Sequence, residues 1–282
     1  MDEQNMNILE RIHASYYQLT VTERKVADFV LSQPSQVQFM SITQLAEECG
    51  TAEATISRFC RSLKLKGFNA FKIELARHSA GSAAKPQPSA TDNLSGRIAE
   101  LGRVATDAVQ QTLELAQPNQ ILRCVELFEG ANQVLCLGSG GSMLIAQEFA
   151  HLFSTVTRKF VAVGDAHMQI SAVATMNPRD VVVLFSYSGA TTVGLQLLEL
   201  ARSRGITTVL VTRFHKSPAA KLADVVLRCG STEGPFQLGS VPAKIAQMIV
   251  MELLFQEYYH RNRQQCEENI QSIASALSGM HV

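Results

Sequence analysis

The sequence lacks any apolar run long enough to cross a membrane. Its uninterrupted hydrophobic stretches are far shorter than the roughly 18 residues that a spanning helix requires. The start of the chain, MDEQNMNILERI, carries acidic side chains and has no apolar signal core. We therefore expect a cytoplasmic protein that makes no membrane contact.

The sequence also lacks cysteine pairs at the spacing of metal sites. Its six cysteines are scattered, and no C-x-x-C pair or histidine ladder accompanies them. This pattern argues against a zinc site or a disulfide framework and indicates buried, reduced thiols. We expect neither a metal nor a cofactor. The cysteines are Cys49, Cys60, Cys124, Cys136, Cys229 and Cys266.

The chain also has no net charge at neutral pH, because 25 basic side chains balance 25 acidic ones. A neutral total argues against nucleic-acid binding, but the distribution of charge matters more than the sum. Between positions 58 and 77 there are six basic residues and one acid, Glu74. The chain of 282 residues, 46% of them hydrophobic, is long enough for two domains, and one of them carries this basic segment. The basic residues are Arg58, Arg61, Lys64, Lys66, Lys72 and Arg77.

The N-terminal third contains the start and stop signals of several short helices. Thr20 with Glu23 and Ser41 with Gln44 form capping boxes, the second opening a helix over 42–49. Gly50 ends that helix, and Thr51 is expected to cap the next, over 52–63. Two short helices joined by a tight glycine turn and followed by basic residues predict a helix-turn-helix domain over 1–78.

In a helix-turn-helix, the second helix enters the major groove of double-stranded DNA by its N-terminal half. We expect that half to be exposed, with Arg58 pairing with guanine or phosphate, and the lysines that follow to contact phosphates. A generic helical bundle with a solvated basic face is the alternative. The predicted DNA-binding residues are Thr51, Glu53, Thr55, Ser57, Arg58, Arg61, Lys64, Lys66 and Lys72.

Residues 79–93 contain small side chains and two prolines but no large apolar residue, which predicts a linker. A long amphipathic helix follows over 94–116. Strands and helices then alternate to the end of the chain, where helix 241–259 and a polar tail helix are expected. This alternation predicts an α/β domain over 94–282 with a parallel sheet covered by helices on both faces.

The most informative stretch is the apolar strand 181–185, which stops abruptly at hydroxyl side chains around Gly189. The turn opens a helix, whose N-terminal N–H groups and dipole favour an anion. The turn contains no lysine or arginine, so it suits one phosphate monoester better than a polyphosphate with its metal. The expected phosphate ligands here are Ser186, Ser188, Gly189, Thr191 and Thr192.

A second turn of this kind follows strand 133–137 and contributes Ser139 and Ser142. Its glycines resemble a dinucleotide-binding loop, but G-x-G-x-x-G fails because position 143 is methionine. The two turns are therefore expected to hold one phosphate group together. Ordinary turn and N-cap chemistry is the alternative.

These motifs resemble two known families. The turns are similar to the phosphate grip of the SIS (sugar isomerase) domain, G-x-[GS]-x-S at 138–142 and S-x-S-G-x-T at 186–191, and 212–224 is similar to its T-x(4)-S-P turn. Leu-Ala-Glu at 45–47, T-I-S-R-F-C at 55–60 and G-F-N-A-F-K at 67–72 resemble the signature of RpiR-family regulators.

The resemblance implies a bacterial transcription regulator that senses a phosphorylated sugar and controls sugar-metabolism genes. A homodimer or homotetramer would read a palindromic operator. The sequence departs from the family where Lys64 stands in place of a frequent glycine, so the helix must take a left-handed cap or continue. Sugar selectivity is assigned to His167, Glu233 and Lys244 at the mouth of the pocket.

A sugar-phosphate isomerase is the competing class of function. Aldose–ketose isomerisation requires a base, and Glu148, His151, His167 and Glu233 are the candidates. We expect no catalysis, because the DNA-binding half would then have no role. A purely structural module is a third reading, which would leave both hydroxyl-lined turns without purpose.

Overall fold

The computed structural model describes residues 7–82, 93–231 and 240–278. These residues form two compact units, one N-terminal up to Gly102 and one from Arg103 onward. The boundary between the units falls within α7 (Leu94–Leu115), beyond the predicted linker 79–93. Helix α6 (Phe68–Ser82) continues into the first residues of that linker, and 83–92 lie outside the described residues.

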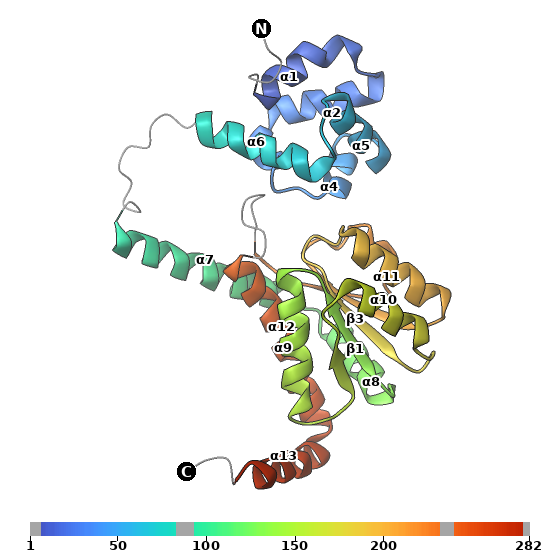
Figure 1. Cartoon of the computed structure of the whole chain (residues 1–282). Coiled ribbons are helices and arrows are strands. Elements are labelled where there is room, and N and C mark those ends of the chain that lie inside the picture. Colours follow the sequence, from blue (N-terminus) through green and yellow to red (C-terminus); the bar gives the residue numbers. More distant parts are fainter. Residues whose placement is uncertain (1–6, 83–92, 232–239, 279–282) are drawn as a thin grey trace. The chain divides into compact units, whose positions relative to one another are not determined.

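The N-terminal unit is entirely helical (Figure 1). Its buried core joins Ile12, Val26 and Ile56 with two phenylalanines, Phe59 and Phe71, whose rings meet edge to face at 5.6 Å. The predicted helical fold is therefore confirmed. The helices are α1 (Ile8–Ser15), a 3-10 turn (Tyr16–Gln18), α2 (Val21–Ser32), α3 (Pro34–Val37), α4 (Ile42–Glu48), α5 (Glu53–Ser62) and α6.

Both predicted capping boxes are formed. Thr20 and Glu23 cap the start of α2 reciprocally, and Ser41 and Gln44 do the same for α4. The Glu23 carboxylate also accepts a hydrogen bond of 3.1 Å from the Ser62 hydroxyl, which ties α2 to α5. Burial alone would raise the pKa of Glu23, but the hydrogen bonds from Thr20 and Ser62 and the charge of Arg58 outweigh it and lower that pKa.

Helices α4 and α5 end in the same way. Gly50 (φ +59°) and Lys64 (φ +59°) occupy the left-handed position after each helix. The next amide then donates back to the helix, Thr51 to Ala46 at 2.8 Å and Leu65 to Cys60 at 2.9 Å. Lys64 thus takes the left-handed cap. The predicted N-cap role of Thr51 is wrong: Ala52 stands at that position, because the backbone of Thr51 completes the preceding helix end.

The C-terminal unit contains a five-stranded, fully parallel sheet in the order β2-β1-β3-β4-β5. Alternate residues of each strand face opposite layers of helices, so β1, β3 and β4 are buried on both faces. The predicted fold class is confirmed. The strands are β1 (Val134–Gly138), β2 (Phe160–Ala162), β3 (Val181–Phe185), β4 (Thr207–Thr212) and β5 (Val225–Arg228).

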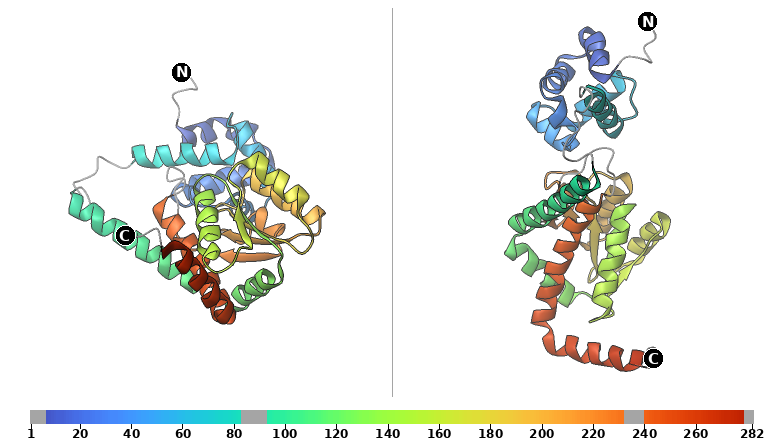
Figure 2. Two further views of the ribbon diagram at one scale, coloured as in Figure 1. Left: turned by 60° about the horizontal axis from the view of Figure 1, so that its bottom comes forward. Right: turned by 90° about the vertical axis from the view of Figure 1, so that its left-hand side faces the viewer.

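Helices cover both faces of this sheet (Figures 1 and 2). One layer contains α8, α9 and α12, with the end of α7, around a phenylalanine cluster centred on Phe149 and Phe153. The other contains α10 and α11. The helices are α7 (Leu94–Leu115), α8 (Pro118–Gly130), α9 (Gly141–Ser154), α10 (Ala166–Thr175), α11 (Thr192–Ser203), α12 (Val241–Arg261) and α13 (Arg263–Leu277), with a 3-10 turn at Ala219–Lys221.

All six cysteines are buried thiols outside any disulfide. Burial raises the pKa of Cys49 to about 11 and of Cys60 and Cys124 to about 12, so these thiols stay protonated at neutral pH. In the described ranges no helix is long and apolar enough to span a bilayer.

The left-handed cap at Lys64 should limit the stability of the N-terminal unit. A side chain in this conformation costs about 1 kcal/mol that glycine avoids. We expect Lys64→Gly to stabilise the unit by about 0.5–1 kcal/mol and Gly50→Ala, the matched change at the equivalent position, to destabilise it by about 1 kcal/mol. An alanine Cβ at Gly50 would meet no atom within 4 Å, so that change tests conformation alone. Urea denaturation followed by circular dichroism measures both, and a lower midpoint for Lys64→Gly would contradict the argument.

Candidate functional site

The sheet reverses its direction of growth between β1 and β3. The chain runs from β1 outward to β2 and then returns to place β3 on the other side of β1. Gly138 is paired with Phe185, so the turns that follow β1 and β3 leave the sheet side by side. Ligands of open α/β sheets bind at this kind of switch point, beyond the carboxyl ends of the strands.

The turn after β1 leads directly into α9. Gly140, at φ +56°, is the N-cap of that helix and has no side chain with which to cap it. Ser139 is exposed, whereas Ser142 is half-buried and its hydroxyl lies 3.4 Å from the Gln247 amide nitrogen on α12. Gly138 must be glycine, because a Cβ there would lie 2.7 Å from the backbone oxygen of Ser142. The turn therefore presents backbone N–H groups and two hydroxyls.

The turn after β3 contains a buried hydroxyl with no partner. Ser186 is only 4% exposed, and its Oγ makes no hydrogen bond to any described residue. Ser188 and Thr191 are exposed, and Thr191 is the N-cap of α11 without a capping bond from its side chain. An unsatisfied buried hydroxyl costs about 1–3 kcal/mol, which a bound acceptor would recover. Thr192, the first residue of α11, is exposed as well.

Gly189 is fixed by a third turn. It has φ +59°, and a Cβ there would lie 2.1 Å from the Ser217 hydroxyl oxygen. Its carbonyl accepts a hydrogen bond of 2.9 Å from the amide of Ala219. The turn after β4, which contains Ser217 and Pro218, therefore packs against the turn after β3 and restricts its conformation.

Two buried amides near these turns were not anticipated from the sequence. Gln169 on α10 is 1% exposed, and its nitrogen donates to the carbonyl of Gly138 at 2.9 Å and of Val163 at 2.8 Å. Gln247 on α12 is 2% exposed and contacts Ser142. A glutamine inside an otherwise apolar helical stretch is the signal that could have indicated both. They hold the turn after β1 from two different helices.

Of the three residues predicted to select the sugar, the structure describes two. Lys244 is half-buried on the first turns of α12, one turn before Gln247, and so lies on the side of α12 that reaches Ser142. His167 is exposed near the start of α10. Glu233 lies outside the described residues.

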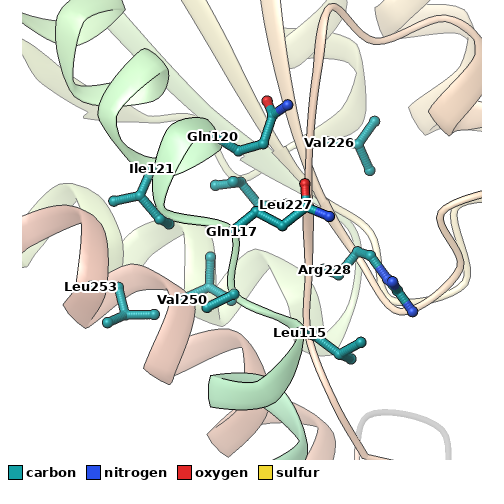
Figure 3. A pocket seen from close by; sticks show the side chains of 10 residues that line it. Leu115, Gln117, Gln120, Ile121, Val226, Leu227, Arg228, Val250 and Leu253 are labelled. Atoms are coloured by element: carbon teal, nitrogen blue, oxygen red, sulfur yellow. The ribbon is translucent and has the colours of Figure 1, made fainter.

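The C-terminal unit also contains a hollow that is separate from the two hydroxyl-lined turns. It lies between the start of α8, strand β5 and α12, and includes no residue of either hydroxyl turn (Figure 3). Gln120 and Arg228 each contribute one buried polar atom with no hydrogen-bond partner among the described residues. Across the described ranges, no group of three or more His, Cys, Asp or Glu side chains is placed to hold a metal ion.

The N-terminal unit presents α5 as its basic helix. Ala54, Arg58 and Arg61 are exposed and Ser57 is half-buried. The expectation that Thr55 is exposed is wrong: it is 4% exposed, because it lies beside Ile56 on the core side of the helix. Its hydroxyl accepts a hydrogen bond of 3.3 Å from the Arg58 guanidinium.

Other predicted DNA contacts differ in their surroundings. The Glu53 carboxylate is half-buried and accepts a hydrogen bond of 2.8 Å from Thr43, which joins α5 to α4. Lys72 is also half-buried, and its ammonium donates to the carbonyl of Met40 at 3.3 Å. Lys64 and Lys66 are exposed beyond the end of α5.

Comparison with known proteins identifies both units. Residues 6–82 match the model of the helix-turn-helix domain of the rpiR family, and residues 127–256 match that of the SIS domain. An uncharacterized HTH-type transcriptional regulator of Caldanaerobacter subterraneus is 31% identical over 251 residues, covering 88% of this chain and 89% of that protein. The chain belongs to the RpiR family of transcriptional regulators.

Two further similarities extend over the RpiR-family chain. The HTH-type transcriptional regulator HexR of Escherichia coli is 27% identical over 277 residues, covering 96% of this chain and 94% of that protein. The structure of the Vibrio vulnificus NanR protein complexed with ManNAc-6P superimposes with a TM-score of 0.87 at 25% identity, covering 98% of this chain and all of that one. The helix-turn-helix unit implies DNA binding.

Contact between Gly189 and Ser217 should make Gly189 irreplaceable. We expect Gly189→Ala to destabilise the C-terminal unit by about 2–4 kcal/mol, because the left-handed backbone and the overlap both oppose a side chain. Gly205→Ala is the matched control, since Gly205, which follows α11, also has a left-handed φ of +68° but open space around a Cβ. It should cost about 1–2 kcal/mol. Thermal unfolding measures both changes, and equal losses would contradict the role assigned to the contact.

Proposed function

We propose that this RpiR-family regulator senses a phosphorylated sugar in its SIS domain and thereby controls genes of sugar metabolism. The proposed phosphate site comprises the turns after β1 and β3. Its ligands are Ser139, Ser142, Ser186, Ser188, Gly189, Thr191 and Thr192.

The observation that carries this proposal is the unsatisfied Ser186 hydroxyl, buried at the end of β3 beside the turn after β1. A phosphate oxygen would accept its hydrogen bond, while the N-termini of α9 and α11 supply backbone N–H groups and dipoles. Neither turn contains a cation, which fits one phosphate rather than a chain of them. That NanR was captured with ManNAc-6P supports a sugar phosphate as the class of ligand.

For the DNA side, we propose that Arg58 and Ser57 contact bases, while Arg61, Lys64 and Lys66 contact phosphates. These side chains lie on the outer face of α5 or just beyond its end. Thr51, Glu53, Thr55 and Lys72 then act by holding the helix-turn-helix together. A homodimer or homotetramer would present paired α5 helices to a palindromic operator.

Among the residues that the structure describes, no geometric observation favours the isomerase alternative. Glu148 and His151 on α9 form a solvated pair 3.8 Å apart, with side chains 50% and 74% exposed. His167 is exposed as well. A general base has to reach the substrate from the lining of a site, and these three side chains face solvent. We propose that the protein is not an enzyme. Turnover of a hexose or pentose phosphate by the purified protein would contradict this.

Removal of the hydroxyls after β3 tests the phosphate site. Each hydrogen bond to a charged phosphate contributes about 1.5–3 kcal/mol, so Ser186→Ala with Ser188→Ala should weaken sugar-phosphate binding at least about tenfold. Ser203→Ala is the matched control, because Ser203 lies at the opposite end of α11 and bonds only its own helix at Leu200. A thermal-shift panel of ManNAc-6P, glucose 6-phosphate and their dephosphorylated sugars measures binding. Undiminished binding by the double variant would refute the site.

Removal of Arg58 tests the DNA face. We expect Arg58→Ala to weaken binding to duplexes selected from a random pool by about 1–3 kcal/mol and to relax their sequence preference. The control is Arg77→Ala, because Arg77 is already neutralised by Glu74 at 2.6 Å. Fluorescence anisotropy measures DNA affinity, and a thermal-shift assay verifies that sugar-phosphate binding is kept. If Arg77→Ala and Arg58→Ala weaken DNA binding equally, then Arg58 contributes only general charge.

A further inference from the structure

The turn after β3 contains a tyrosine side chain that contacts two other segments of the C-terminal unit. Tyr187 stands between Ser186 and Ser188, and its ring meets Phe214 edge to face at 6.0 Å. Its carbonyl accepts hydrogen bonds of 3.1 Å from both the Thr212 hydroxyl and the Arg213 amide. The backbone of Tyr187 is thus fixed to the end of β4. The side-chain hydroxyl of Tyr187 makes a separate contact.

That hydroxyl donates a hydrogen bond of 3.0 Å to the carbonyl of Ser231, which is 44 residues further along the chain. Ser231 is 4% exposed and has φ +77°, a conformation that costs a non-glycine residue roughly 1–3 kcal/mol. Its own hydroxyl is buried without a partner among the described residues. Such a residue stays in this conformation only while its neighbours hold it there, so Ser231 is suited to change between two arrangements.

The neighbours that hold Ser231 belong to α7. The Ser231 amide donates to the Gln111 side-chain oxygen at 3.2 Å, and the Gly230 amide donates to the Thr112 hydroxyl at 2.9 Å. A Cβ at Gly230 would lie 2.6 Å from Gln111 Cβ and 2.7 Å from the Thr112 amide nitrogen. The backbone after β5 therefore touches the α7 backbone directly, and no flexible side chain lies between them to absorb a movement.

We infer that Tyr187, Ser231 and Gln111 form a relay that transmits occupancy of the phosphate site to α7. A phosphate drawn to Ser186 and Ser188 moves the turn that bears Tyr187, and the change in the Tyr187–Ser231 hydrogen bond shifts Ser231 against Gln111. The part of α7 from Arg103 to Leu115 belongs to the C-terminal unit, and the chain that precedes it leads to the helix-turn-helix. The inference rests on the proposed phosphate site and makes Tyr187 a positioning residue rather than a ligand.

The test uses the full-length protein with inorganic phosphate as the probe and hydrogen exchange as the measurement. In the wild type, phosphate should slow exchange in the turns at 138–142 and 186–192 and change exchange in 103–115. Tyr187→Phe keeps the ring and removes the hydroxyl. It should keep the protection of both turns and lose the response of 103–115. Tyr258→Phe, which removes the hydroxyl of a buried tyrosine in the same unit, should behave as the wild type.

Gln111→Ala interrupts the other end of the relay and should reproduce the Tyr187→Phe result. Because the two groups act in series, the double variant should show no further loss. With a sugar phosphate that stabilises the wild type, the change in DNA affinity on saturation should fall to within about twofold of none in each variant, against about 5–150-fold for typical allosteric coupling.

The possible results distinguish a failure of the relay from a failure of the phosphate site on which the relay depends. If phosphate protects neither turn in the wild type, the phosphate site itself is wrong. If the turns are protected but Tyr187→Phe still changes exchange in 103–115, the relay is wrong and the site stands.

Discussion

The parallel pairing of β1 with β3 is the constraint on which the C-terminal unit depends. It brings the end of one strand at Gly138 beside the end of the other at Phe185, although the two are far apart in sequence. Each strand then has to turn into a helix, and each turn exposes N–H groups at the start of that helix. The two hydroxyl-lined turns leave the sheet side by side because of this register.

The turns themselves are held by close packing and hydrogen bonds rather than by charge. Glycine stands where the turn after β1 approaches α9 and where the turn after β3 approaches Ser217. Contacts this tight restrict each turn to small movements, so the donors are largely oriented before a ligand binds and a ligand shifts the turn only slightly. Preorganised donors bind with less loss of entropy than mobile ones. The cost of that arrangement is the buried Ser186 hydroxyl, which has no hydrogen-bond partner among the described residues.

Local signals in the sequence predicted much of this structure. Capping boxes, apolar strands and glycine turns depend on residues close in the chain, and the helices and strands they predict are present. The predictions were wrong where contacts between residues far apart in the sequence determine the structure. Thr55 is buried because packing against the core, not helix propensity, sets which face of α5 points inward. Ala52 rather than Thr51 is the N-cap of α5, because the backbone of Thr51 completes the end of the preceding helix. Gln169 and Gln247 could not be assigned to the site, because only the fold brings α10 and α12 to the turn after β1.

The distribution of charge separates two kinds of recognition in one neutral chain. Basic residues gather at and beyond α5, where DNA phosphates would be met by full charges and binding would depend strongly on salt. The proposed sugar-phosphate site relies on hydroxyls, amides and helix dipoles, which bind an anion more weakly and lose less affinity in salt. A sensor must release its ligand when the metabolite is scarce, so moderate affinity is an advantage. Allosteric coupling needs only about 1–3 kcal/mol, the scale of one hydrogen bond together with one strained residue such as Ser231.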